Sequence, residues 1–156
     1  MSSSAADRAH LQAPTLHAIE WFETLNEPDV ALMGELYSSQ TFFKDPFNEV
    51  HHLRDVQAIF AHMFKRLHEP RFVVTHAFDH VDGTALAAVL TWEFHFSVRA
   101  DKTAKPWLIQ GATHLRFGPT GLITYHRDYW DAAEELYERI PVLGALMRWL
   151  KRQATR

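Results

Sequence analysis

The sequence contains no cysteine. Disulfide bonds, thiol nucleophiles and cysteine-ligated zinc sites are therefore excluded, and the chain is compatible with the cytoplasm, where we expect it to act. An excess of one charge is also lacking, because 16 Lys and Arg residues stand against 19 Asp and Glu residues, for a formal net charge of −3. This balance gives no reason to expect nucleic acid or an anionic membrane as a partner.

Long apolar runs are absent as well. No stretch approaches the roughly 18 residues that a membrane span requires, and the small, polar first six residues do not have the pattern of a signal peptide. The sequence has neither a Gly-rich phosphate loop nor a Gly-x-Ser-x-Gly elbow. We therefore expect a soluble protein that does not use nucleotide or serine-hydrolase chemistry.

Aromatic side chains are abundant, at 13% of the chain, with five Trp and eleven Phe among 156 residues. Together with 47% hydrophobic and 22% charged residues, this composition indicates a globular protein with enough aromatic side chains to line a pocket as well as fill a core. The length fits one domain. We expect a disordered tail over residues 1–12 and a single domain over residues 13–156.

The first half of the chain has helical periodicity. Apolar residues at helical spacing predict helices over residues 14–25, over residues 29–37 with Asp29 as the cap, and over residues 56–67. A short strand over residues 41–44 should stop at Asp45-Pro46, because proline cannot donate a hydrogen bond to a sheet.

After Pro70 the period changes to two. Strands are predicted over residues 72–81 and 85–98, joined at Asp82-Gly83, and over residues 107–117 and 122–130, joined by residues 118–121. Two further helices should form a C-terminal extension over residues 131–156. Helices followed by long antiparallel strands predict an α+β fold, with the helices on one face of the sheet.

The second hairpin predicts which side chains point inward. A four-residue loop over residues 118–121 places Thr113 opposite His126 and Gly111 opposite Asp128. The inward face is then mostly apolar, with Trp107, Ile109, Leu115, Phe117, Leu122 and Trp130. Three polar residues lie among them, namely Thr113, His126 and Asp128. Polar side chains on such a face need partners. They either hydrogen-bond locally and hold the core together, or they face a cavity.

Asp45 follows a strand and lies among Phe42, Phe43 and Phe47. A carboxyl group in apolar surroundings loses hydration, which suits a general base. Asp before Pro is also a common way to start a turn, so a purely structural role is open too.

Three stretches together resemble the nuclear transport factor 2-like superfamily, which includes ketosteroid isomerases and SnoaL-like polyketide cyclases. They are Leu36-Tyr37 followed by residues 42–46, the turn over residues 115–123, and His-Arg-Asp-Tyr-Trp-Asp at residues 126–131. The resemblance implies a cone-shaped fold in which a strongly curved, mixed sheet wraps around the N-terminal helices and a pocket opens between them. Fold and activity are loosely coupled in such superfolds, so the activity depends on the pocket.

In the isomerases, the aspartate of the Asp-Pro pair is the base that moves a proton next to a carbonyl group, and Asp45 matches it. The partners of that base do not match, because Trp21 stands at the position of the tyrosine and Thr113 at the position of the protonated aspartic acid. Steroid isomerisation is therefore not expected. The resemblance to SnoaL-like cyclases, which use pocket aspartates, makes Asp128 the candidate second carboxylate. His126 lies two residues away on the same strand face and could relay a proton or orient Asp128.

The predicted site therefore has Asp45, Asp128 and His126 as catalytic residues. Its ligand-binding residues are predicted to be Trp21, Phe60, Met63, Trp92, Phe94, Thr113 and Trp130. Such a pocket suits a small hydrophobic carbonyl compound and a cofactor-free isomerase, cyclase or dehydratase. A module that binds an apolar ligand without turnover, or a dimeric protein-interaction scaffold, is the alternative, and the sequence does not decide whether turnover occurs.

Metal ions, cofactors and membranes are not expected partners. His76 and His80 have metal-ligand spacing for a helix, but on a strand they lie roughly 13 Å apart. The outward residues Tyr125, Arg127 and Tyr129 suit a homodimer formed through the sheet. The C-terminal helix has an apolar stripe and a basic face, and we expect it to cover the sheet or pocket mouth, or pack in a dimer, rather than dock on a membrane.

Overall fold

The computed structural model describes residues 7–100 and 105–132. The predicted C-terminal extension, from residue 133 on, lies outside the described residues. The described elements, in chain order, are α1 (Ala13–Thr24), the 3₁₀ helix η1 (Glu27–Glu35), β1 (Tyr37–Lys44), β2 (Glu49–Val50), α2 (Leu53–Arg66), β3 (Leu67–Asp82), β4 (Ala85–Val98), β5 (Trp107–Phe117) and β6 (Ile123–Tyr129). No helix within these ranges is both long and apolar enough to cross a membrane.

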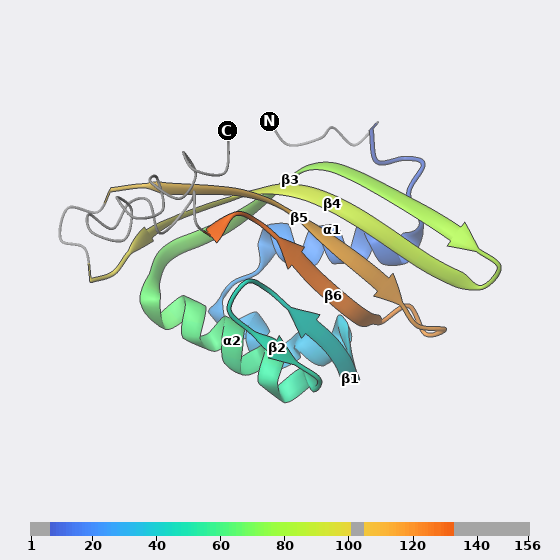
Figure 1. Ribbon diagram of the computed structural model, residues 1–156, viewed down its shortest axis with the longest axis horizontal. Coiled ribbons are helices and arrows are strands. Elements are labelled where there is room, and N and C mark those ends of the chain that lie inside the picture. The colour runs from blue at the N-terminus through green and yellow to red at the C-terminus, as the bar shows by residue number, and fades with distance from the viewer. Residues whose placement is uncertain (1–6, 101–104, 133–156) are drawn as a thin grey trace, which may run out of the picture.

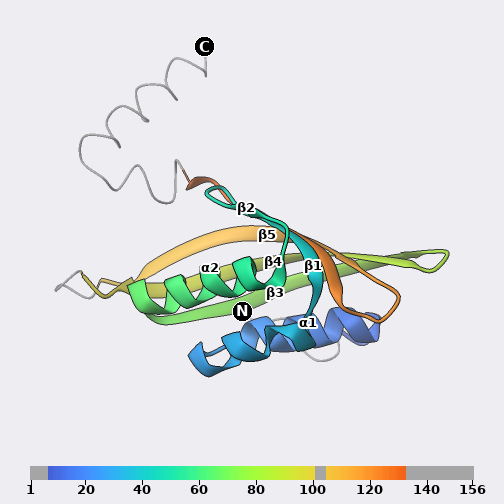
Figure 2. The same ribbon diagram turned by 90° about the horizontal axis from the view of Figure 1, so that it is seen from below.

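The strands form one six-stranded sheet in the order β2-β1-β6-β5-β4-β3. Only the pairing of β1 with β6 is parallel, and all other neighbours are antiparallel. The sheet bends around α1 and α2, which both lie on its concave side (Figures 1 and 2). The predicted α+β class and the curved, mixed sheet wrapped around N-terminal helices are therefore confirmed.

The sequence explains where most elements begin and end. Proline occupies the first turn of α1, where its missing N–H costs nothing. β1 ends at Lys44, directly before Asp45-Pro46, as predicted. The β3–β4 hairpin turns at Gly83, whose positive φ of 61° suits glycine.

The segment between α1 and β1 differs from the prediction. It is a 3₁₀ helix, and its cap is Asn26 rather than Asp29. Asp29 instead completes a capping box, accepting a hydrogen bond from the Asn26 backbone N–H at 3.0 Å. The helix ends at Glu35, so Tyr37 belongs to β1 and not to the predicted helix.

The β5–β6 hairpin has a register different from the predicted one. Thr113 pairs with Asp128 and Leu115 with His126, two residues away from the predicted pairing. One residue of this difference comes from the turn, where Phe117 pairs with Ile123 rather than Leu122, and the other from a register shift between Arg116 and Phe117. The bulge interrupts the alternation along β6, because Ile123 and His126, three residues apart, are both buried. Thr113 and His126 are buried, as predicted, whereas Ile123 rather than Leu122 fills the core at the start of β6.

Residues 7–12 also differ from the expected disordered tail. The Arg8 guanidinium donates two hydrogen bonds to the Glu23 carboxylate, at 2.9 and 3.0 Å. The Gln12 backbone N–H donates to Asp79 on β3 at 2.7 Å, and Leu11 is buried. These contacts fasten the segment before α1 to the sheet, so the folded unit begins earlier than the composition suggests.

Candidate functional site

A cavity of about 350 Å³ lies between α2 and the concave face of the sheet. Its lining is dominated by aromatic and aliphatic side chains, with four titratable or charged residues among them. The aromatic residues are Phe43, Phe47, Phe60, Phe72, Trp92, Phe94, Phe96, Trp107 and Trp130; the aliphatic ones are Ile59, Met63, Leu67, Val98 and Ile109; the polar ones are Asp45, His62, Arg66 and Asp128. A volume and lining of this kind are typical of a site for a small, mainly apolar molecule.

One face of α2 forms a wall of this cavity. It contributes Ile59, Phe60, His62, Met63 and Arg66, which follow one another at the spacing of a single helix face. Phe60 is buried, whereas His62 and Arg66 are exposed. The helix therefore presents apolar side chains to the interior and polar ones at the rim.

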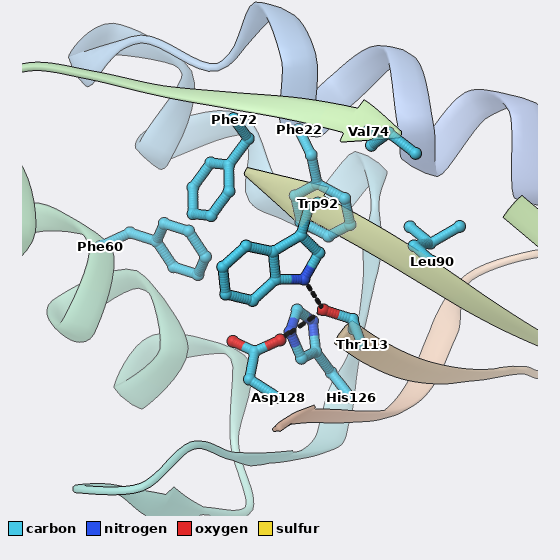
Figure 3. A pocket seen from close by; sticks show the side chains of 9 residues that line it. All are labelled: Phe22, Phe60, Phe72, Val74, Leu90, Trp92, Thr113, His126 and Asp128. Atoms are coloured by element: carbon cyan, nitrogen blue, oxygen red, sulfur yellow. Dashed lines mark hydrogen bonds and ion pairs between the residues drawn. The ribbon is translucent and has the colours of Figure 1, made fainter. Parts of the chain in front are cut away.

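A smaller void of about 20 Å³ lies deeper in the molecule (Figure 3). Its lining residues come from α1, α2 and four strands: Phe22, Phe60, Phe72, Val74, Leu90, Trp92, Thr113, His126 and Asp128. Phe60, Phe72, Trp92 and Asp128 also line the large cavity. Asp128 thus stands where the large cavity meets the buried interior.

The Asp128 carboxylate is held on one side only (Figure 3). Its Oδ1 accepts hydrogen bonds from the Thr113 hydroxyl at 2.5 Å and from His126 Nε2 at 2.8 Å. Thr113 in turn accepts a hydrogen bond from the indole N–H of Trp92 at 2.7 Å. Oδ2 has no hydrogen-bond donor within residues 7–100 and 105–132, and it points toward the side of Phe60.

Tyr37 completes the network from behind. Its hydroxyl lies 2.8 Å from Nδ1 of His126, and the two residues are only 1% and 3% exposed. An ionised Asp128 can only accept, so His126 donates from Nε2. The Tyr37 proton then needs Nδ1 as its acceptor, because no other partner is within reach among the described residues, and this assigns the neutral Nε2–H tautomer to His126.

The electrostatics of Tyr37 agree with this assignment. Burial raises the pKa of its hydroxyl well above 10.0, and the negative charge of Asp128 raises it further. The phenol therefore remains a donor at neutral pH. The His126 ring is fixed by its packing as well, since it contacts Phe43 with ring centroids 4.6 Å apart and the edge of Phe22 at 5.6 Å.

Asp45 lines the same large cavity, but its carboxylate is already engaged. Oδ1 accepts hydrogen bonds from the backbone N–H groups of Phe47 and Asn48, both at 2.7 Å. The Asn48 side-chain amide lies 3.0 Å from both carboxylate oxygens. This is the turn-forming arrangement that an aspartate before proline favours, and it holds Phe47 at the cavity wall.

Most residues of the predicted site meet in one place. Asp45 and Asp128 share the large cavity, and the predicted walls Phe60, Met63, Trp92, Phe94 and Trp130 all line it. Thr113 and His126 lie behind Asp128 at the small void. Trp21 lines neither space and packs half-buried against the core.

Tyr37 and Arg66 are the residues that sequence reasoning missed. Tyr37 is predicted at the end of a helix, and the sequence of residues 37–44 has no clear alternation that would have moved it to the strand beside His126. Arg66 lies near the end of the helix predicted over residues 56–67, and only its spacing from Phe60 and Met63 puts it on the cavity face. Within residues 7–100 and 105–132, no group of three or more His, Asp or Glu side chains is placed to bind a metal ion.

The comparisons with known proteins agree with this fold. A family model described as the SnoaL-like domain matches residues 18–126. Among solved structures, a nuclear transport factor 2-like superfamily protein from Salmonella enterica aligns with a TM-score of 0.64 at 15% identity, covering 82% of this chain and 93% of its own. The search of curated proteins found no significant match.

Two further structures have related names. A protein with a ketosteroid isomerase-like fold from Catenulispora acidiphila, in complex with trimethylamine, has a TM-score of 0.61 and 15% identity, covering 80% of this chain and 89% of its own. A protein assigned as a SnoaL-like polyketide cyclase from Shewanella putrefaciens has a TM-score of 0.62 and 17% identity, covering 81% and 98%. At such identities the likeness shows the fold, and the activity has to come from the site.

Proposed function

This chain belongs to the SnoaL-like domain family, and we propose that it is a cofactor-independent acid/base enzyme acting on a small hydrophobic carbonyl compound. The observation that carries the proposal is the Asp128 carboxylate. One oxygen is fixed by Thr113 and His126, and the other is left for a ligand at the wall of an aromatic cavity. A carboxylate that is oriented and yet open on one side is suited to accept a proton.

The proposed step is proton abstraction next to the carbonyl group. The C–H bond breaks, the proton passes to Oδ2 of Asp128, and the electron pair spreads onto the carbonyl oxygen as an enolate. Return of the proton to another carbon gives isomerisation. Attack of the enolate carbon on a second carbonyl group of the same molecule forms a C–C bond and an alkoxide, and return of the proton from Asp128 to that alkoxide completes a cyclisation. A ligand that fills the mainly apolar cavity displaces water from it, which strengthens the electrostatic interactions inside.

His126 and Tyr37 act as positioning residues in this scheme. With Nε2–H directed at Asp128 and Nδ1 occupied by Tyr37, the imidazole keeps the carboxylate in one orientation. Asp45 is a second carboxylate in the same cavity. Because both its oxygens already accept hydrogen bonds from the 45–48 turn, we assign it the role of holding that turn and Phe47 against Trp130, whose ring centroid lies 5.5 Å away.

Deuterium exchange tests the proposal without knowledge of the natural substrate. Propiophenone, a small aryl ketone, is incubated with the protein in D₂O, and loss of the proton signal next to the carbonyl is followed by NMR. Asp128→Asn should slow the catalysed exchange by about 10²–10⁴-fold, the usual contribution of a general base. Asp45→Asn should slow it less, and Asp82→Asn, an exposed carboxylate in the β3–β4 hairpin, is the matched control.

Ligand binding separates the two main alternatives. Trp92, Trp107 and Trp130 line the cavity, so quenching of intrinsic fluorescence reports occupancy. Lost exchange with retained affinity in Asp128→Asn supports the enzyme. Binding without any exchange by the wild-type protein would instead identify a module that holds an apolar ligand, and equal exchange in wild type and Asp128→Asn would refute the role of Asp128.

We also propose that the protein forms a homodimer through the outward face of the sheet, as the family resemblance implies. The predicted residues Tyr125, Arg127 and Tyr129 lie on this face, together with the exposed apolar side chains of Val89 and Leu108. Sedimentation velocity of wild type and of Leu108→Glu tests this, and a wild-type monomer at all concentrations would contradict it.

A further inference from the structure

Two of the three charged residues that line the large cavity, Asp128 and Arg66, lie at different positions along its α2 wall. Asp128 and Phe60 line the small void together, which places the Asp128 carboxylate beside the first half of the α2 wall. Arg66 lines the cavity six residues further along α2, about 9 Å at the rise of an α-helix. Between them the α2 wall is formed by Met63, with His62 at the exposed rim. The cavity therefore has a carboxylate toward one end and a guanidinium at the other.

The Arg66 side chain is not needed to satisfy the backbone carbonyl groups at the C-terminal end of α2. The last carbonyl groups of α2 are satisfied by Arg99, whose backbone N–H donates to the Arg66 carbonyl at 3.0 Å. The Arg99 Nε lies 3.3 Å from the Phe64 carbonyl and 2.8 Å from the Leu67 carbonyl. In the part of the chain that the structure describes, the Arg66 guanidinium forms no ion pair or side-chain hydrogen bond of its own.

The neighbouring cation supplies a contrast. Lys65 is also exposed and directly precedes Arg66 in the last turn of α2, but it does not line the cavity. A general attraction of cations to a helix C-terminus would act on both residues. Only Arg66 combines that position with access to the cavity, and its planar guanidinium can donate two parallel hydrogen bonds to a carboxylate.

We infer that Arg66 binds an anionic group of the ligand, and that the natural substrate is an oxo acid: an apolar body with a reactive carbonyl near Asp128 and a carboxylate at the rim. This inference rests on the proposed function for the position of the reacting carbon. The anionic end stays in partly solvated surroundings beside Arg66, with His62 one turn earlier on the same face, so its charge does not have to enter the aromatic interior. The apolar body fills the cavity between the two ends.

A pair of ligands that differ only in charge tests the inference. γ-Benzoylbutyrate has an aryl ketone, a short methylene spacer and a carboxylate, and its primary amide has nearly the same size without the charge. Dissociation constants for both are measured by quenching of tryptophan fluorescence, with wild type, Arg66→Gln, Arg66→Lys and the control Lys65→Gln. Circular dichroism and thermal unfolding verify that each variant is folded.

Wild type should bind the carboxylate about tenfold more tightly than the amide, the size of effect expected for one charge-assisted contact at a partly exposed site. Arg66→Gln should lose this preference while its affinity for the amide stays unchanged. Arg66→Lys should keep part of the preference, and Lys65→Gln should keep all of it. Equal affinity of wild type for the two ligands, an unchanged preference in Arg66→Gln, or binding of neither ligand overturns the inference.

Deuterium exchange of the same two ligands keeps the two proposals apart. If the amide binds and its protons next to the ketone exchange in an Asp128-dependent manner, the proposed function stands even when the carboxylate preference is absent. If the carboxylate preference is present and depends on Arg66 but no exchange occurs, the anion subsite stands and the catalytic role of Asp128 fails.

Discussion

Replacing Tyr37 with Phe removes one oxygen atom from the network behind Asp128 and leaves the packing of the ring in place. In the wild-type protein that oxygen donates to Nδ1 of His126 at 2.8 Å, in a site where both residues are almost fully buried. In the variant, Nδ1 either stays without a donor or takes the proton from Nε2. The first arrangement leaves a buried nitrogen without a partner, and the second breaks the hydrogen bond from His126 to Asp128. Each therefore destabilises the folded state.

The size of the cost follows from this geometry. Leaving one buried acceptor without a partner typically destabilises a protein by about 1–3 kcal/mol. For a chain of this length, each kcal/mol lowers the melting temperature by roughly 2–4 °C. Tyr125→Phe is the matched control, because Tyr125 is half-exposed on the outward face and stacks on Phe42 at 5.0 Å through its ring rather than its hydroxyl.

The pH dependence gives an independent test. Because burial and the charge of Asp128 raise the pKa of Tyr37 in the folded state, the unfolded chain loses this proton first when the pH passes 10.0. Above that pH the folded state binds more protons than the unfolded state, so the free energy of unfolding decreases as the pH rises. The contribution is fully present below pH 10.0 and is progressively lost above it. Tyr37→Phe should lack this alkaline loss.

Urea denaturation of wild type, Tyr37→Phe and Tyr125→Phe at neutral and alkaline pH measures both effects. Nitrogen NMR of His126 reports the tautomer directly: wild type should show a protonated Nε2 and an unprotonated Nδ1, and Tyr37→Phe should show a mixture. Equal stability of Tyr37→Phe and wild type, together with an unchanged His126 spectrum, would refute the assigned network.

Two other substitutions test the packing around the site. Gly111→Ala places a Cβ 2.4 Å from the Trp92 ring, so we expect the free energy of unfolding in urea to fall by about 1–3 kcal/mol and the tryptophan fluorescence to change. Gly34→Ala is the control and should be tolerated, because its Cβ meets no atom closer than 3.5 Å. Thr41→Val should stabilise the fold by about 1 kcal/mol, because the Thr41 hydroxyl is buried without a partner among the described residues. Thr15→Val should destabilise it, since that hydroxyl is hydrogen-bonded, and a higher melting temperature for Thr15→Val would contradict this reasoning.

Much of the fold could be read from the sequence because its signals are local. Alternation of apolar residues placed β4 and β5 at the bounds that the structure has, and Asp82-Gly83 and Asp45-Pro46 marked a turn and a strand end. Alternation also identified Thr113, His126 and Asp128 as inward-facing. The helix η1 was misread because a 3₁₀ helix has nearly the same apolar spacing as one turn of α-helix.

The cross-strand register was beyond sequence reasoning because the turn length and a bulge both change it. The turn pairs Phe117 with Ile123 instead of Leu122, and the shift between Arg116 and Phe117 adds one residue more. Together they put Thr113, rather than Gly111, beside Asp128, with the Thr113 hydroxyl 2.5 Å from the carboxylate. No pattern within β5 or β6 reports such a shift. The role of Tyr37 was hidden for a related reason, since its partner lies 89 residues away along the chain.

The sequence by itself determined that this protein has one curved sheet around helices and an aromatic pocket with aspartates on inward-facing or strand-end positions. Only the tertiary structure decided which aspartate is available. Both carboxylate oxygens of Asp45 accept hydrogen bonds within the turn that it starts. In Asp128, one oxygen accepts hydrogen bonds and the other is available to a ligand. The reason is physical: periodicity fixes the side of an element on which a residue lies, but hydrogen-bond partners depend on elements that meet only after folding.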